Sequence, residues 1–321
     1  MGRFIIRRLI WTVFIVLLVS VLTFLIFFVL PSGDPALRFA GKQPTAELIA
    51  QARANLGLDK SLPEQYWLFL KHLVTGDEYG WPGLGYSFHT RDAVLPELIN
   101  RARVTGSIII GGAALWMLIG VPVGVISALK RRTIWDRGLM GVCLFFVSAP
   151  VFWLALLSLL IFWKKLHWLP GTGYVAFAES PGQWFAHLIL PWCVLALLYA
   201  AIYARIVRAN MIDVVSEDYI RTAYAKGLSP RRVVMHHELK PALAPVVALF
   251  ATDLGALVGG TIVTETVFNM QGLGNWLLIA ANNNDLPVTM AVTIVVAAAV
   301  SLLTLVADVL LAAIDPRVRL Q

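Results

Sequence analysis

The sequence predicts an all-α protein whose chain crosses a lipid bilayer six times. Of its 321 residues, 59% are hydrophobic and only 14% are charged, whereas about a quarter of the residues of a soluble domain are charged. The charged residues lie mostly between apolar runs, and most runs approach the ~20 residues that a helix needs to cross a bilayer. A helix satisfies its own backbone hydrogen bonds, which a lipid environment requires. A polytopic helix bundle is therefore predicted.

The first apolar run, residues 9–30, follows three basic residues, Arg3, Arg7 and Arg8. A secretory signal peptide also starts with basic residues, but its apolar region is only about 7–15 residues long. The run here is long enough to cross a bilayer. It is therefore predicted to be a retained membrane span.

Residues 31–103 separate the first run from the second and are predicted to be extracytoplasmic. The patterns at 45–56 and 63–74 indicate helices, the second beginning with Pro63 in its first turn. The second helix has a broad apolar face, which is expected to pack on neighbouring spans or at the lipid interface. Residues 1–103 are thus predicted to comprise the first span and this segment.

Five further apolar runs follow, at 104–129, 138–163, 188–204, 242–263 and 288–314. They are predicted to form a five-helix core over 104–314, followed by a cytoplasmic tail at 315–321. Prolines such as Pro150 lie within or near the ends of these runs, where a kink is tolerated if neighbouring groups satisfy the freed carbonyls.

Basic residues are distributed unevenly among the segments that join the runs. Most of the 26 Lys and Arg residues lie near the two termini, in the short loop 130–137 and between 205 and 240. Short cytoplasmic loops carry such an excess. Both termini and these loops are therefore predicted to be cytoplasmic, and residues 31–100 to lie outside. The same rule explains the formal net charge of +7 without a nucleic-acid partner.

The charged stretch at 217–245 indicates two helices joined by a turn. Gly227 can adopt the positive φ that commonly ends a helix. Pro230 suits the first turn of the next helix, with Ser229 as its N-cap. The first helix is expected to present small and basic groups to a partner on one side, at Tyr219, Ala223 and Lys226.

This stretch resembles the cytoplasmic coupling loop of ATP-binding-cassette (ABC) importer permeases, in the form seen in the dipeptide and oligopeptide subfamily. The match runs through Tyr219, Arg221, Thr222, Ala223, Ala225, Lys226, Gly227 and Leu228. The sequences TETVFNMQGLG at 264–274 and DPR at 315–317 resemble two further segments of the family. The sequence departs from the family at Gln271, where a proline is usual, and at 78–83, which are inserted into an N-terminal motif.

The resemblance implies the type I ABC importer permease fold and one permease subunit of a larger assembly. The expected partners are a homologous second permease, two cytoplasmic ATPase subunits, an extracytoplasmic substrate-binding protein and membrane lipid. The coupling loop at 210–241 would bind in a groove of an ATPase subunit. The protein is expected in a bacterial or archaeal plasma membrane. The implied cargo is di- or oligopeptides, with nickel, haem or another small solute as the alternative.

Nothing in the sequence indicates an enzyme active site, a metal site or a cofactor held by this chain. There is no GxSxG or GxxxxGK[ST] motif and no zinc-type spacing, and the adjacent His236 and His237 lack the i, i+4 spacing of a ligand pair. ATP and Mg²⁺ are therefore expected on the partner ATPases. Cys143 and Cys193 lie in apolar runs and are expected to be small packing residues.

Three acidic residues lie within or near the ends of predicted spans, and ionisable side chains at such depth are functional candidates by default. Asp253, halfway along its span, lies either on a hydrated translocation path or in a structural hydrogen bond. Glu265, at the outer mouth, either lines the entry or pairs structurally. Asp308 is expected to form a structural pair with Arg205 or Arg208.

A proton-coupled secondary transporter that uses Asp253 is the second class of function that these acids allow. Such a transporter would be expected to show internal repeats and broken helices that carry the site. No convincing repeat is visible in the sequence, and this class leaves the coupling stretch unexplained. An ATP-driven importer accounts for more of the sequence.

Overall fold

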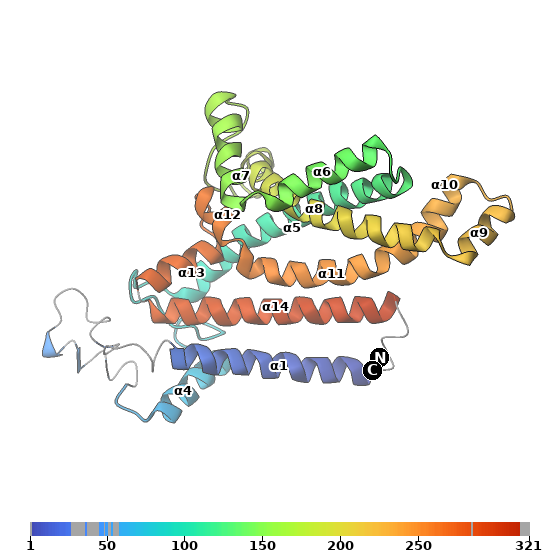
Figure 1. Cartoon of the computed structure of the whole chain (residues 1–321). Coiled ribbons are helices and arrows are strands. Elements are labelled where there is room, and N and C mark those ends of the chain that lie inside the picture. The colour runs from blue at the N-terminus through green and yellow to red at the C-terminus, as the bar shows by residue number, and fades with distance from the viewer. Residues whose placement is uncertain are drawn as a thin grey trace. The chain divides into compact units, whose positions relative to one another are not determined.

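The computed structural model describes residues 2–26, 58–283 and 285–314, together with the isolated positions 36, 45–47, 49–50 and 53. Within these residues the secondary structure is helical, joined by turns and loops, and contains no β-strand (Figure 1). The all-α prediction is thereby confirmed for the described part of the chain. The tail at 315–321 and half of the residues of the predicted helix at 45–56 lie outside the described residues.

The chain divides into two compact units, which are described separately below. The first contains Thr105–Gln271 with both ends of the chain, and the second contains Ile6–Val104 with Gly272–Leu302. Two long helices, α5 (Val94–Leu129) and α14 (Leu286–Ile314), contribute residues to both units.

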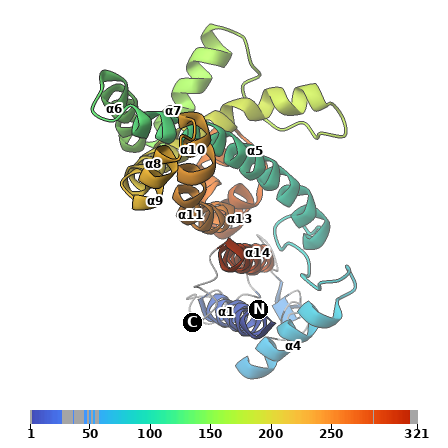
Figure 2. The same cartoon turned by 90° about the vertical axis from the view of Figure 1, so that its right-hand side faces the viewer.

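The first unit is built around α8 (Pro181–Val215), which α6, α7 and α11 all contact. The other helices of this unit are α6 (Ile134–Ser148), α7 (Val151–Ser158), the π-helix η2 (Leu159–Lys165), α9 (Asp218–Ala225), α10 (Pro230–Val233), the π-helix η3 (Val234–Glu238), α11 (Leu239–Gly260) and α12 (Ile262–Val267). Figure 1 shows α8 and α11 extending toward α9 and α10, and Figure 2 shows these four elements grouped together when seen from that end. The first unit therefore has α9 and α10 at one end and α12 at the other (Figure 1).

Glycines on α5 allow close approach of this helix to α8. A Cβ atom at Gly120 would lie 2.9 Å from the carbonyl oxygen of Ala200, and one at Gly124 would lie 2.6 Å from that of Ala204. Small residues permit such contacts between membrane helices. Cys143 of α6 is buried against Ala204 of α8, so the expectation of a small packing cysteine is confirmed for this residue.

The predicted span at 138–163 is broken near its middle, because the chain bends by 100° between α6 and α7. Pro150 stands directly before α7, where it cannot donate a backbone hydrogen bond, and Ala149 before it is extended. A proline disfavours the helical conformation of the residue that precedes it. In the described residues five helical segments are long and apolar enough to span a membrane, or up to six if this bent pair counts as one span.

The second unit contains most of α1 (Gly2–Phe24), together with α4 (Leu62–Thr75) and α13 (Leu273–Asn282). The predicted helix at 63–74 is confirmed as α4. Its apolar face packs on α1, where Tyr66 shares a hydrogen bond of 2.8 Å with Ser20 and lies 5.4 Å from the ring of Phe24. Packing on a neighbouring span was one of the two expectations for this face.

Two carboxylates hold the loop between α4 and α5. Asp77 accepts hydrogen bonds from the backbone N–H groups of Tyr79 at 2.8 Å and Gly85 at 2.7 Å, which closes the inserted residues 78–83 into a compact turn. Asp285, just before α14, accepts from the hydroxyl of Ser87 and from the N–H of Phe88 at 3.0 Å. No pattern in the sequence indicates this role of Asp285, which is buried and nearly 200 residues from its partners along the chain.

Candidate coupling element and buried acids

The stretch at 217–233 forms the predicted helix, turn and helix. Helix α9 ends at Ala225, and Gly227 follows with a φ of +76°. The N–H of Gly227 donates to the carbonyl of Tyr224 at 2.9 Å, which satisfies one of the last carbonyls of α9. Helix α10 begins with Pro230 at its first position and Ser229 as N-cap. The predicted roles of glycine and proline in this turn are therefore confirmed.

A small internal core holds α9 and α10 together. Ile220 and Ala223 of α9 and Val233 of α10 are buried against one another, with Val214 and Leu228 packed around them. Residues three apart lie on the same face of a helix, so Ile220 and Ala223 turn inward together. The expectation that Ala223 is presented to a partner is therefore wrong: its side chain is only 6% exposed, because α10 folds over it.

The outer face of α9 is exposed and carries both polar and aromatic groups. The exposed residues of α9 are Asp218, Tyr219, Arg221, Thr222, Tyr224 and Ala225, and Lys226 directly after it is exposed too. Arg221 lies 3.5 Å from Asp218, but both side chains are open to solvent, so this pair contributes little stability. Partial burial raises the pKa of the Tyr219 and Tyr224 phenols, and nearby acidic groups raise it further. Both phenols are therefore neutral hydrogen-bond donors at physiological pH.

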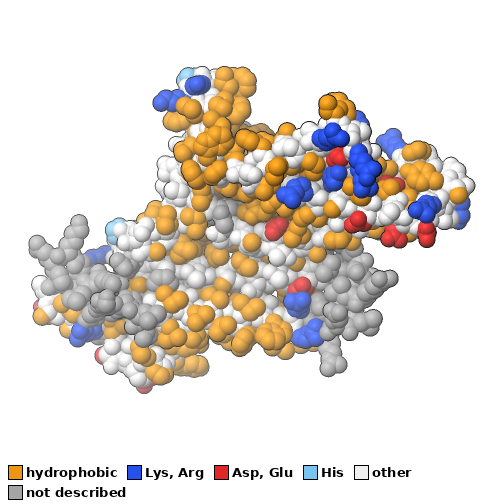
Figure 3. Space-filling model, in the orientation of Figure 1, with side chains coloured by type: hydrophobic (Ala, Val, Ile, Leu, Met, Phe, Trp, Pro, Cys, Tyr) orange, Lys and Arg blue, Asp and Glu red, His pale blue; other side chains and the backbone are white. Residues whose placement is uncertain are grey.

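Basic side chains surround this element. Figure 3 shows Lys and Arg gathered at the end of the first unit that carries α9 and α10, whereas the middle of the same unit is largely hydrophobic on this face. Among the exposed basic residues of this end are Lys130 and Arg131 of the α5–α6 turn and Arg231 and Arg232 of α10. This is the charge distribution that the positive-inside rule requires of a cytoplasmic end.

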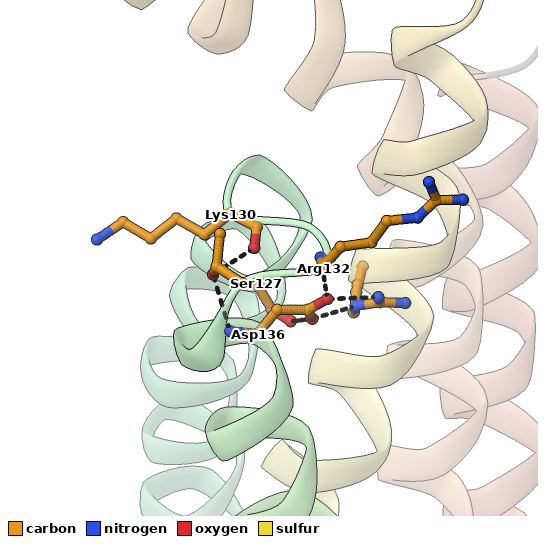
Figure 4. Close-up of polar contacts among 6 residues, drawn as sticks. Ser127, Lys130, Arg132 and Asp136 are labelled. Atoms are coloured by element: carbon orange, nitrogen blue, oxygen red, sulfur yellow. Dashed lines mark hydrogen bonds and ion pairs between the residues drawn. The ribbon is translucent and has the colours of Figure 1, made fainter.

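An ion pair ties the helix that enters the coupling element to the α5–α6 turn (Figure 4). Arg208 of α8 donates from two nitrogens to the two carboxylate oxygens of Asp136, at 2.7 and 2.8 Å. Asp136 is 4% exposed and also accepts from the Ser127 hydroxyl at 2.5 Å and the Arg132 N–H at 2.9 Å. Bidentate, charge-assisted pairs of this kind are strong and directional. We call Asp136 and Arg208 the clamp.

The helix that leaves the coupling element is also fixed to α8. The side-chain amide of Asn210 donates to the backbone carbonyl of Ala242 on α11 at 3.0 Å. Elements α9 and α10 therefore lie between two helix ends that are joined to each other, and one of these ends is clamped to α6. Neither Asn210 nor Asp136 was predicted from the sequence, although an acidic residue inside the basic loop 130–137 is a visible signal.

The clamp changes the assignment of Arg208. Arg208 was one of the two partners predicted for Asp308, with Arg205, but both bonded nitrogens of Arg208 point to Asp136. Asp308 is half-buried on α14. Its pairing with the other candidate, Arg205, stays a prediction.

The two remaining acids have hydroxyl partners. Asp253, half-buried on α11, accepts from the phenol of Tyr203 on α8 at 2.7 Å. Glu265 of α12 is completely buried and accepts from Thr105 at 2.7 Å and Thr261 at 2.9 Å. For Glu265 this geometry favours the structural alternative over a position at an open entry. The geometry of Asp253 is compatible with both of its alternatives.

Family models match nearly the whole chain. The model described as "Binding-protein-dependent transport system inner membrane component" matches residues 120–320, and the model for the N-terminal part of such membrane components matches residues 1–109. Among solved structures, the inward-facing MetNI methionine ABC transporter superposes with a TM-score of 0.54 at 20% identity. That match covers 69% of this chain and 97% of the MetNI chain. At this identity the likeness concerns the fold alone, which is that of an ABC importer permease.

Curated relatives align over 319 residues, or 99% of this chain. The "Probable peptide ABC transporter permease protein y4tP" of Sinorhizobium fredii is 35% identical, and the alignment covers 100% of its length. The glutathione transport system permease protein GsiC of Escherichia coli is 38% identical, and the alignment covers 99% of its length.

Proposed function

The chain belongs to the family of binding-protein-dependent transport system inner membrane components, and on that premise we propose that it is the permease subunit of an ATP-driven importer of di- or oligopeptides. The proposed assembly contains a homologous second permease, two cytoplasmic ATPases that hold ATP and Mg²⁺, and an extracytoplasmic binding protein that delivers the cargo. The peptide cargo is supported by the similarity to the peptide and glutathione permeases.

The observation that carries the proposal is the exposed face of α9 on a rigid support. The element is short, has its own small core, and presents Tyr219, Arg221 and Lys226 outward. An idle connection between two spans would need no such core. The neutral phenols of α9 and the cations Arg221 and Lys226 would fit a groove on a partner protein that offers hydrogen-bond acceptors and acidic groups.

The proposed mechanism follows from how the element is anchored. An ATPase that moves α9 also moves α8, because the connection from Val215 at the end of α8 to Asp218 at the start of α9 is very short. The clamp passes that movement to α6, and the hydrogen bond of Asn210 passes it to α11. Closure of two ATPases would thus shift the equilibrium between inward- and outward-facing bundles, because the ATPases bind the two states with different free energies.

Charge reversal on the exposed face tests this function. The chain is reconstituted in proteoliposomes with its ATPases and binding protein, and peptide uptake and ATP hydrolysis are measured together. Arg221→Glu with Lys226→Glu is expected to abolish co-purification of the ATPases and peptide uptake. Lys164→Glu, an exposed change on η2 away from α9, is the matched control and should behave as wild type. Normal uptake in the double variant would reject the proposed docking role.

A further inference from the structure

We propose that Asp253 and the aromatic side chains beside it form a binding site for an ammonium group of the cargo, within the helix bundle of the first unit. This inference rests on the proposed peptide cargo, since a peptide carries an ammonium group at its N-terminus and on any lysine. The ligand class is a primary alkylammonium ion.

The carboxylate of Asp253 is oriented but only partly engaged. The phenol of Tyr203, which is fully buried, donates to Oδ2 at 2.7 Å. Within the described part of the chain Asp253 makes no other hydrogen bond and no ion pair, and its side chain is partly exposed. One carboxylate oxygen therefore remains available on a side chain that cannot turn away from its position without losing the Tyr203 bond.

Three aromatic side chains pack together on α5, α8 and α11. Trp116 of α5 is completely buried and stacks on Tyr199 of α8 with ring centroids 4.7 Å apart, and the ring of Phe250 on α11 lies 5.4 Å from it. Phe250 stands three residues before Asp253, and Tyr199 stands four residues before Tyr203. Such spacings place each pair on one face of its helix. The carboxylate and the aromatic rings thus face the same contact between α8 and α11.

This combination is suited to a cation. An ammonium group has three donors and no acceptor, so it can bond to the available carboxylate oxygen and lie against ring faces, where the aromatic quadrupole attracts it. Two other acids of this unit have partners within the protein: Asp136 has Arg208, and Glu265 has two hydroxyl donors. A carboxylate at membrane depth that has only one hydroxyl partner gains most from a transient positive ligand.

The test compares two peptides of the same sequence, lysine-free, one with a free N-terminus and one acetylated. Their uptake is measured in proteoliposomes that contain the complete importer. Asp253→Asn keeps the shape but removes the charge, and it should reduce uptake of the free peptide at least about fivefold, as expected when a charge-assisted hydrogen bond becomes a neutral one. Uptake of the acetylated peptide should stay unchanged, Asp253→Glu should restore part of the loss, and Thr252→Val at the exposed neighbouring position should have no effect.

A second measurement asks whether the position is reached from the transport path. Asp253→Cys, in a chain whose Cys143 and Cys193 are replaced by Ala, should react with a thiol reagent that carries an ammonium group, and the free peptide should slow this reaction. Three results would overturn the inference: equal loss of both peptides in Asp253→Asn, no loss of either, or no reaction of the introduced thiol with and without ATP. Absence of uptake of both peptides by the wild-type importer would instead reject the peptide cargo, and the ammonium site with it.

Discussion

Replacement of Gly227 by valine should weaken docking of the ATPase without affecting membrane insertion. Gly227 has a φ of +76°, and a Cβ atom built on it would meet no atom of the described residues within 4 Å, apart from its direct chain neighbours. The cost of a side chain is therefore the backbone conformation itself and not a collision inside the protein. For an L-residue this left-handed conformation costs roughly 1–2 kcal/mol, and a β-branched residue is the least suited to it.

That cost is of the same order as the stability of the element. Its core consists of three buried side chains, Ile220, Ala223 and Val233, and full burial of one large aliphatic side chain contributes about 1.5–3 kcal/mol. A penalty of about 1.4 kcal/mol corresponds to a tenfold change in an equilibrium constant. Gly227→Val should therefore weaken ATPase docking about tenfold, whereas Gly227→Asn should be nearly neutral, because asparagine tolerates the left-handed region.

The assay is a titration of purified ATPase against permease in nanodiscs, with hydrolysis and peptide uptake measured on the same preparations. The asparagine variant is the matched control, since it adds a side chain at the same place without the full backbone cost. Wild-type affinity in the valine variant would mean that docking does not depend on this backbone conformation. Equal damage by asparagine and valine would show that any side chain at this position is harmful and that φ is not the cause.

Three further predictions concern other parts of the chain. Asp136→Ala should lower the free energy of unfolding by about 2–4 kcal/mol, because it leaves the partly buried Arg208 without its partner. Adding Arg208→Ala should recover part of this loss in a thermal unfolding experiment. If the double variant instead lost as much stability as the two single variants together, the result would argue against the clamp. A membrane-impermeant thiol reagent applied from outside should label Thr90→Cys and not Ser229→Cys, and the reverse pattern would overturn the proposed orientation. Asp285→Asn should speed hydrogen exchange at the backbone N–H of Phe88, whereas unchanged exchange would mean that this carboxylate does not hold the loop.

Local features of the structure could be predicted where one residue decides the backbone. Gly227 and Pro230 fix the turn between α9 and α10 because few other residues adopt those conformations. Apolar runs likewise predict the helices that cross the membrane. At Pro150 the same kind of reasoning indicated a tolerated kink, but the size of the bend, 100°, depends on how α7 packs on α8 and not on the proline alone.

Contacts between distant residues could not be predicted from one sequence. Arg208 was assigned to an acid at a similar depth, and only the fold brings Asp136, 72 residues away, within hydrogen-bond distance. Ala223 matched a family pattern and was assigned to the outer face, yet the packing of α10 decides that it turns inward. Of the hydroxyl partners of Glu265, Thr261 stands four residues before it, at a helical spacing, whereas no spacing in the sequence relates it to Thr105 of α5.

Cross-linking of single cysteines on α9 to the ATPase examines the coupling role itself. In a chain whose Cys143 and Cys193 are replaced, Tyr219→Cys, at a position 46% exposed, should cross-link to an ATPase subunit, and ATP should change the yield. Ala223→Cys, at a position 6% exposed, should not cross-link in the same membranes. A coupling element should give a cross-link from Tyr219→Cys whose yield depends on nucleotide. If no exposed position of α9 cross-linked to the ATPase in complexes that still transport peptide, the coupling role would be ruled out.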